Sequence, residues 1–437
     1  MSLCSFAAPP ERIAAAAAPN SSSRAADAFF RDARLCPDGS CVLATAEDRS
    51  LSLLPLPFDP DTPVASTSRQ LEPAWTHKPP DSVLSAAWYP GASAYDPAMF
   101  AFAAGVKDHP VQLWDGSDRR VRASYPIVDH TERFVAPHDM TFSPDGSSLY
   151  CGFENAIEVF DVGRPGEEGF RMHTTPTRSS RQGQKGIISS LAFSPPATAT
   201  GSSLLAAGSF SGTVGLYDPS LHKPLVILLF PSQRGGVTKV LFHPLSPHLL
   251  FVASRHSTHL DVWDLRNTLR RSSGGRLARK ARTNQRLGFD IDPSGTWLAV
   301  GDQDGHLSVF SAQPLPDELE PVASFPLSPE PISTTLFHPT QPWLVTTSGT
   351  RRFRKPKPGV RERDWLDSGS SDESNEEDGP KRSGADGARD EEDGNASKAA
   401  GAGERDADGG HEGGRTTSPI HADALSGADS LGIWKLS

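Results

Sequence analysis

A three-residue pattern returns seven times along the chain and limits the folds that the chain can adopt. Each copy has a bulky apolar residue, then any residue, then proline, and successive prolines lie 46 to 54 residues apart. The copies are Leu35-Cys36-Pro37, Trp88-Tyr89-Pro90, Phe142-Ser143-Pro144, Phe193-Ser194-Pro195, Phe242-His243-Pro244, Ile291-Asp292-Pro293 and Phe337-His338-Pro339. Turn residues follow several of these prolines, so each copy predicts a strand that ends in a tight turn. A regular period of this length indicates a protein built from repeated units.

Two further strands are predicted after each turn. The first is rich in small residues, as in Ala103-Ala104-Gly105, which suits a strand packed between neighbouring sheets. The second alternates apolar and other residues and ends in an aromatic residue, often followed by Asp. Three strands per repeat, with a fourth supplied between repeats, describe a β-propeller. The pairs Trp114-Asp115 and Trp263-Asp264 in this register resemble WD repeats, although the Gly-His dipeptide of ideal WD repeats is largely missing.

The seventh repeat is interrupted. After Pro339 the expected third strand does not occur until Leu431-Gly432-Ile433-Trp434, which predicts an insertion of about 75 residues inside the last blade. Because an open ring would leave bare sheet edges, we expect the C-terminal strand to complete the sheet that begins near Ile332. The predicted fold class is all-β: a seven-bladed WD-repeat β-propeller with a long disordered acidic insertion in the last blade. A six-bladed ring with a tail is the alternative, and it would leave residues 332–348 as an isolated hairpin.

These patterns divide the chain into four segments. Residues 1–28 are expected to form a flexible N-terminal arm, with the alternative that they supply the outer strand of the seventh blade. Residues 29–354 carry the seven repeats. Residues 355–429 contain few apolar groups, so they cannot bury enough surface to offset the entropy lost on ordering, and we expect a disordered acidic insertion. Residues 430–437 supply the strand that closes blade seven.

The insertion also holds most of the net charge. The whole chain carries −10, and the stretch from residue 364 to residue 393 contains twelve acidic and three basic residues. The remainder is therefore close to neutral and can carry basic patches. Ser370 and Ser374 each stand three residues before a glutamate, a pattern that resembles acidophilic kinase sites, and phosphate there would deepen the negative charge. A solvating loop without a specific role is the alternative interpretation.

Several function classes find no support in the sequence. There is no signal peptide and no apolar run long enough to cross a bilayer, so we expect an intracellular protein without a membrane partner. The four cysteines have no metal-binding spacing and are expected to be reduced and buried, with a Cys36–Cys41 disulfide as the alternative. His243 and His338 share one repeat position, which favours a structural contact over a metal site. Phosphate-binding loops, nucleophile elbows and HExxH motifs do not occur, so we expect no enzyme, cofactor, metal or small-molecule substrate.

Longer strings make a more specific match than the WD pattern. They are Cys151-Gly152-Phe153, Gly163-Arg164-Pro165-Gly166, Gln182-Gly183-Gln184-Lys185-Gly186-Ile187-Ile188-Ser189, Gly235-Gly236-Val237-Thr238 and Thr283-Asn284-Gln285-Arg286. In this order they resemble the telomerase Cajal body protein family, also called the WD-repeat antisense-to-p53 family. The resemblance runs from about Phe30 to Gly349 and from Leu431 to Lys435. The chain differs from the animal pattern in its N-terminal extension of about 28 residues and in its long acidic insertion.

The resemblance implies a function. Members of the family are nuclear propellers that bind box H/ACA small Cajal body RNAs and telomerase RNA through a loop motif, the CAB box, alongside the dyskerin complex. It therefore implies a non-catalytic scaffold that assembles and localises small nuclear RNPs in the nucleus, in Cajal bodies or their equivalent, with a link to telomere maintenance. A cytoplasmic pool is left open. Fungal relatives have been linked to spliceosomal small nuclear RNPs, so the alternative is a protein-binding adaptor of those particles without direct RNA contact.

Basic residues in loops between strands are the candidates for RNA contact. Single-stranded RNA is recognised by bases stacked on aromatic rings or guanidinium planes and by phosphates held by Lys and Arg. The candidates are Arg178, Arg181, Lys185, Arg255, His256, Arg276, Arg279, Lys280, Arg282, Arg286, Arg351, Arg352, Phe353 and Arg354. Because these loops join strands of successive blades, we expect them to converge on one rim. A solvated surface residue is the alternative for each, and Arg286 also has a structural alternative because it precedes a core strand.

Overall fold

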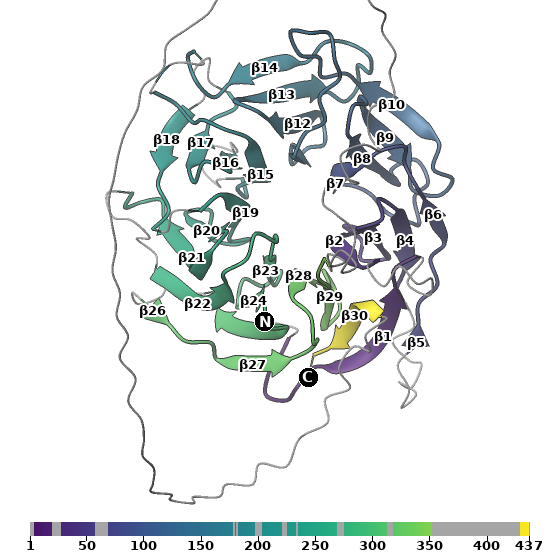
Figure 1. Cartoon of the computed structure of the whole chain (residues 1–437), viewed down its shortest axis with the longest axis vertical. Coiled ribbons are helices and arrows are strands. Elements are labelled where there is room, and N and C mark those ends of the chain that lie inside the picture. Colours follow the sequence, from purple (N-terminus) through teal and green to yellow (C-terminus); the bar gives the residue numbers. More distant parts are fainter. Residues whose placement is uncertain are drawn as a thin grey trace, which may run out of the picture. The chain divides into compact units, whose positions relative to one another are not determined.

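The regular structure of the chain consists of β-strands arranged in seven sheets around a ring (Figure 1). This computed structural model describes residues 4–19, 28–56, 69–177, 180, 182–196, 203–220, 225–232, 235–268, 275–312, 318–351 and 429–436. Among these residues no helix is long and apolar enough to cross a membrane. Each sheet is a blade with four antiparallel strands, which we name A to D from the centre of the ring outward, and two blades have an additional short parallel strand. The fold is the predicted seven-bladed propeller.

The first four blades use strands that follow one another in the chain. Blade 1 contains β2 (Phe30–Leu35), β3 (Cys41–Ala46), β4 (Leu51–Pro55) and β6 (Trp75–His77). Blade 2 contains β7 (Val83–Trp88), β8 (Ala101–Val106), β9 (Val111–Asp115) and β10 (Val121–Tyr125). Blade 3 contains β11 (Asp139–Phe142), β12 (Ser148–Phe153), β13 (Ala156–Asp161) and β14 (Phe170–His173). Blade 4 contains β15 (Ile188–Phe193), β16 (Leu205–Ser209), β17 (Val214–Tyr217) and β18 (Leu225–Leu229).

Among the remaining three blades, blades 5 and 7 each add a short parallel strand at the outer edge. Blade 5 contains β19 (Val237–Phe242), β20 (Leu249–Ser254), β21 (Ser257–Asp264), β22 (Gly275–Ala281) and the parallel β26 (Glu318–Leu319). Blade 6 contains β23 (Phe289–Ile291), β24 (Trp297–Gly301), β25 (His306–Ser311) and β27 (Ala323–Pro326). Blade 7 contains β28 (Ile332–Phe337), β29 (Trp343–Ser348), β30 (Asp429–Lys435), β1 (Glu11–Ala17) and the parallel β5 (Arg69–Gln70).

Blade 7 is completed from both ends of the chain, so the ring closes. β30 pairs with β29 on one side and with β1 on the other, and Trp434 stands opposite Leu344 and Arg12. The Trp434 side chain is 1% exposed and donates its indole N–H to Oγ1 of Thr346 at 2.8 Å. Since β28 and β29 belong to this complete sheet, the six-bladed alternative with an isolated hairpin is wrong.

Residues 4–19 differ from the predicted flexible arm. β1 is the D strand of blade 7, and the Phe6 ring packs at 5.7 Å from Trp297 and 6.4 Å from Phe337 between centroids. The alternative in which N-terminal residues supply the outer strand is therefore the one that the structure shows. An alanine run has no alternation of apolar and polar residues, so the pattern did not predict this strand. Most of the expected insertion, from residue 355 to residue 428, lies outside the described residues.

Apolar side chains fill the interfaces between blades rather than one central core. Seven clusters of buried residues each join two neighbouring blades, and together they cover all seven interfaces of the ring. The small residues of the B strands permit this packing. A Cβ atom at Gly152 would lie 2.7 Å from Cγ2 of Ile188, and one at Gly301 would lie 2.6 Å from Cγ2 of Ile332. In each case the contact is with the first part of the next A strand.

Polar side chains also connect neighbouring A strands. The Asp139 carboxylate of blade 3 accepts the backbone N–H of Leu191 in blade 4 at 2.7 Å, and Asp290 of blade 6 accepts that of Phe337 in blade 7 at 2.8 Å. Each contact removes the carboxyl group from water, and this burial raises the pKa of both carboxyl groups. The four cysteines are buried thiols, as predicted, and the alternative Cys36–Cys41 disulfide is not formed.

The antiparallel order gives the ring two different faces. We call the face that carries the turns between strands A and B, and between C and D, the AB face. The DA face carries the turns between strands B and C and the connections from each D strand to the A strand of the next blade. The repeated proline motifs lie on the AB face, because each follows an A strand.

Candidate nucleic-acid interface

Most of the predicted basic residues that the structure describes belong to the DA face. Lys185 precedes β15, Arg255 and His256 form the B–C turn of blade 5, and Arg282 and Arg286 precede β23. Arg279 and Lys280 stand at the end of β22 that leads to this face, and Arg351 follows β29 on it. Arg276 stands at the opposite end of β22. Arg178, Arg181, Arg352, Phe353 and Arg354 lie outside the described residues, as do the phosphorylation candidates Ser370 and Ser374.

A phenylalanine brings part of this set together. Phe210 lies in the B–C turn of blade 4, and its half-buried ring has the Arg255 guanidinium 4.3 Å and the Arg286 guanidinium 5.3 Å from its centroid. The His138 ring approaches Phe210 edge-on, at 6.2 Å between centroids with an interplanar angle of 73°. We call Phe210, Arg255, Arg286 and His138 the Phe210 cluster. Its members come from blades 4 and 5 and from the connections that lead into blades 3 and 6.

The string around Gln184 positions the Phe210 turn and Lys185 beside it. The backbone carbonyl of Lys185 accepts the hydroxyl groups of Ser209 and Ser211 at 2.6 and 2.5 Å, and the Phe210 N–H bonds to the carbonyl of Ile187 at 2.9 Å. The side chain of Gln184 is fully buried and donates to the carbonyl of Ala207 at 2.7 Å. The exposed Lys185 is therefore held next to the cluster.

The Thr283-to-Arg286 string connects three blades on the same face. Asn284 accepts a hydrogen bond from Nε2 of His256 at 2.8 Å, and Gln285 donates its amide to the carbonyl of Gly349 at 2.8 Å. The next residue, Arg286, reaches Phe210. One short connection thus fixes the B–C turns of blades 5 and 7 relative to the Phe210 cluster.

Charge within the cluster is positive. Burial lowers the pKa of the Arg286 guanidinium, and the carboxylates of Asp139 and Asp32 oppose that shift, so this arginine keeps its charge. Burial also lowers the pKa of Arg255. Burial, followed by repulsion from Arg286, lowers the pKa of His138, which favours its neutral form. Two guanidinium groups therefore flank one ring, an arrangement stabilised by cation–π attraction.

Comparison with known proteins gives relatives over most of the ring. No family model matches the chain. Telomerase Cajal body protein 1 of Rattus norvegicus is 34% identical over 336 residues, which cover 75% of this chain and 60% of that protein. The Homo sapiens protein of the same name is 34% identical over 338 residues, covering 75% of this chain and 58% of that protein. Guanine nucleotide-binding protein negative regulator 1 of Schizosaccharomyces pombe is 30% identical over 311 residues, which cover 69% of this chain and 75% of that protein.

The chain belongs to the telomerase Cajal body protein family of WD-repeat propellers. It spans about 60% of the length of the two mammalian relatives. Two of the strings that predicted this family, around Gln184 and from Thr283 to Arg286, build the surroundings of the Phe210 cluster.

Other predicted residues have structural partners instead. Arg279 is 6% exposed and donates to the carbonyl groups of Leu287 and Ser254, both at 3.2 Å, and burial lowers its pKa to about 10. It was predicted as an RNA contact, and that prediction is wrong because its guanidinium is enclosed. Lys280 pairs with Asp304 at 2.9 Å and Arg351 with Glu47 at 2.5 Å, both at the surface. The exposed Arg282 anchors its connection through its backbone N–H, which bonds to Gln303 at 2.8 Å.

Phe210 and His138 were missed by the sequence analysis. A signal for Phe210 was present: the B–C turns of blades 1, 2, 3, 5 and 6 carry polar residues at their tips, whereas blade 4 carries an aromatic residue. An aromatic residue at a turn where the other blades carry polar residues points to a contact that does not recur around the ring. No comparable signal marks His138, because its approach to Phe210 depends on the curvature of the ring.

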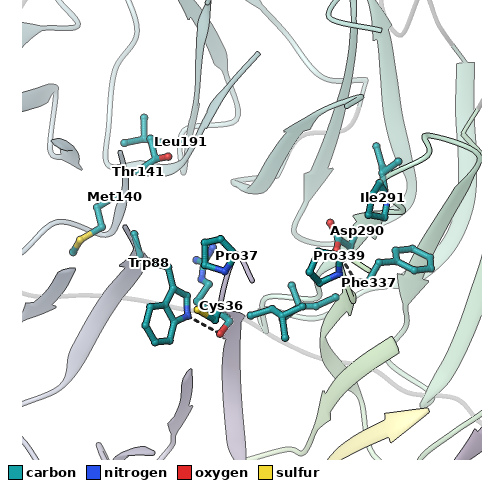
Figure 2. Close-up of a pocket in the computed structure, with 15 residues that line it drawn as sticks. Cys36, Pro37, Trp88, Met140, Thr141, Leu191, Asp290, Ile291, Phe337 and Pro339 are labelled. Atoms are coloured by element: carbon teal, nitrogen blue, oxygen red, sulfur yellow. Dashed lines mark hydrogen bonds between the residues drawn. The ribbon is translucent and has the colours of Figure 1, made fainter. Parts of the chain in front are cut away.

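The AB face has a cavity on the axis of the ring instead of a basic cluster. The cavity has a volume of about 370 Å³ and is lined by residues from the A strands of six blades and the turns that follow them. Figure 2 shows Trp88 and Met140 on one side and Ile291 and Phe337 on the other, with the Phe337–Asp290 hydrogen bond drawn. Within the described part of the chain, no group of three or more His, Cys, Asp or Glu side chains is placed to hold a metal ion.

The two repeated histidines make the structural contact that was predicted. His243 bonds through Nε2 to the carbonyl of Gly295 at 2.9 Å, and His338 bonds in the same way to Gly39 at 3.0 Å. In each case Nδ1 accepts backbone N–H groups of the turn that follows the histidine. These contacts join blade 5 to blade 6 and blade 7 to blade 1 on the AB face.

Proposed function

We propose that the chain is a non-catalytic RNA-binding scaffold for small nuclear RNPs, and that single-stranded RNA binds at the Phe210 cluster. The observation that carries this proposal is the pair of guanidinium groups packed against one half-buried aromatic ring on the DA face, 4.3 and 5.3 Å from its centroid, with the exposed Lys185 on the adjoining connection. The relatives are named for telomerase and the Cajal body, which supports a nuclear RNP role. From the family resemblance we take box H/ACA small Cajal body RNA and telomerase RNA as the RNA class, with dyskerin-complex or other RNP proteins as partners.

The chemistry of the cluster suits an unpaired base. Stacking on an aromatic or guanidinium plane contributes about 1–3 kcal/mol per base and needs no base pairing. Lys185 and the arginines supply positive charge for the phosphates on either side of such a base. Because the cluster is built by connections from several blades, it is held rigid without a ligand, which lowers the entropy lost on binding.

Direct binding is tested with the purified chain and a hairpin RNA that carries a CAB box in its loop. We expect the hairpin to bind more tightly than the same hairpin with a mutated loop, and the logarithm of the affinity to fall linearly with the logarithm of the salt concentration. The variant Lys185→Gln should reduce that slope by about one, which is the loss of one phosphate contact. Equal affinity for both loops would contradict the proposal.

The second candidate is a protein-binding propeller that joins spliceosomal or other RNPs through their proteins. Two observations favour it: the axial cavity on the AB face, and the Schizosaccharomyces pombe relative, whose name refers to guanine nucleotide-binding proteins. This function requires no affinity for naked RNA. If this candidate is right, variants of the Phe210 cluster should recover as much RNP from cell extract as the parent chain does. If the scaffold proposal is right, the same variants should no longer recover the RNA.

A further inference from the structure

Two links join the B–C turn of blade 5 to the connection that leads into blade 6. In the first, Arg255 and Arg286 both lie against Phe210. In the second, Nε2 of His256 lies 2.8 Å from Oδ1 of Asn284. Both His256 and Asn284 are exposed on the DA face. The second link therefore stands at the border of the Phe210 cluster, where a base stacked on the cluster would present its edge.

In the structure the Asn284 amide turns its oxygen toward Nε2 of His256. An amide oxygen only accepts, so this arrangement corresponds to the tautomer with the proton on Nε2. With Oδ1 turned to the imidazole, the two N–H donors of the Asn284 amide remain for a ligand. Asparagine recognises adenine through both ends of its amide, one accepting and one donating. Here His256 already bonds to the amide oxygen of Asn284, so the amide can offer a ligand only its N–H donors.

We propose that Asn284 is a specificity-determining residue that selects guanine or uracil, which carry a carbonyl oxygen at C6 or C4, over adenine or cytosine, which carry an amino group at that position. This inference rests on the proposed function, because it concerns a base bound at the same cluster. The neighbouring groups agree with it: Arg255, Arg286 and Lys185 also carry only donors. An amino group of adenine or cytosine would face donors at this edge, whereas a carbonyl oxygen would accept from them.

The test uses the full chain and a series of hairpin RNAs in which each loop nucleotide is replaced in turn. At a guanosine read by Asn284, inosine keeps the carbonyl oxygen and should bind within twofold of the parent RNA. The base 2-aminopurine lacks that oxygen and should bind about tenfold more weakly, in line with the 1–3 kcal/mol of a good base contact. At a uridine, replacement by cytidine makes the same distinction.

Three variants connect the discrimination to the amide. Asn284→Ala should lose most of the difference between inosine and 2-aminopurine, and Asn284→Asp, which keeps the shape but has no donors, should bind both RNAs more weakly. His256→Ala releases Oδ1 of Asn284, so the amide can rotate. The loss of affinity for an RNA that carries adenine at this position should then be smaller than in the parent chain. Asn267→Ala, an exposed asparagine in the C–D turn of blade 5 on the opposite face, is the matched control and should behave as the parent chain.

The outcomes separate this inference from the function on which it rests. If the parent hairpin binds with loop preference and salt dependence, but Asn284→Ala keeps the same ratio of affinities at every loop position, the inference is wrong and the proposed function stands. If no hairpin binds in preference to its loop mutant, the proposed function fails first. Thermal unfolding of each variant is measured alongside, and Asn284→Asp provides the readout if Asn284→Ala unfolds below the assay temperature.

Discussion

On the AB face His243 and His338 are buried, and each ring bonds to a carbonyl group in the next blade and to backbone N–H groups of its own turn. On the DA face His256 is exposed and bonds to the side chain of Asn284. The AB-face histidines use all their hydrogen-bonding capacity inside the protein. The DA-face histidine bonds to the oxygen of an exposed amide, and the N–H donors of that amide are the ones that the proposal above assigns to a ligand. The same residue type thus stabilises one face and prepares the other for a ligand.

The contrast follows from repetition. His243 and His338 occupy one repeat position, and any residue that recurs in this way serves a contact that recurs around the ring. Phe210, Asn284 and Arg286 occur once, at turns or connections where other blades have different residues. These residues make no contact that recurs around the ring, and for that reason the DA face is where we place the candidate site.

Opening the ring should have the largest effect. Trp434→Ala removes a buried indole from the blade that closes the ring and leaves the Thr346 hydroxyl without its partner. We expect the free energy of unfolding to fall by about 3–5 kcal/mol, the cost of a large-to-small core substitution. Denaturant unfolding measures the change. A loss below about 1 kcal/mol would mean that β30 contributes little to closure.

Removing one AB-face histidine should destabilise the protein without weakening RNA binding. His338→Ala leaves the Gly39 carbonyl and the N–H groups of Thr340 and Gln341 without a partner, which should cost about 2–3 kcal/mol of unfolding free energy. Hairpin affinity, measured well below the unfolding temperature, should not change. His130→Ala, at an exposed histidine, is the control and should alter neither quantity. Weaker RNA binding by folded His338→Ala would contradict the separation of the two faces.

Substitution within the cluster should give the reverse result. Phe210→Ala removes the ring that holds both guanidinium groups, so hairpin affinity should fall about 5- to 150-fold, equivalent to 1–3 kcal/mol for one stacked base. Because the ring is only half-buried, stability should change less than in the two variants above. Phe170→Ala, whose ring is 68% exposed on the outer strand of blade 3, is the matched control for fluorescence anisotropy titrations. If both variants bind equally well, RNA does not stack at Phe210.

The ring could be predicted from the sequence because each repeat of the proline motif corresponds to one blade. Each proline motif ends an A strand, so counting the motifs counts the blades, and the missing strand after Pro339 locates the split blade. β1 could not be predicted in this way, because its alanine run lacks the alternation that marks a half-buried strand. It is a strand because β30 offers it an edge, which is a property of the closed ring.

The candidate site was predicted only in part, for a geometric reason. Arg255 and Arg286 were chosen for their charge and position in loops, and both reach the cluster. Arg279 was chosen on the same grounds, but the alternating burial of β22 places its side chain inside. His138 stands 72 residues before Phe210 in the chain, and only the arrangement of the blades brings their rings together. Charge and loop position are local properties, whereas burial and convergence belong to the assembled ring.

The smallest expected effect is the pH dependence that the two AB-face histidines contribute to stability. Burial lowers the pKa of His243 and His338 below the ordinary value of 6.5, so the folded protein favours the neutral rings. As the pH falls below about 6.5, the unfolded chain binds protons that the folded chain does not, and the stability contributed by the neutral rings is lost.

The comparison with a variant isolates this contribution. His138, Asp139 and Asp290 also have shifted pKa values, but they are common to the parent chain and to the variant His243→Gln, so their effect cancels in the difference. The parent chain should lose more unfolding free energy than His243→Gln between pH 7.5 and pH 5.5, measured by denaturant unfolding at each pH. Parallel pH profiles would show that His243 is protonated as easily in the folded ring as in the unfolded chain. The burial that favours the neutral ring would then be offset by the Gly295 carbonyl, which accepts from Nε2 and favours the protonated form.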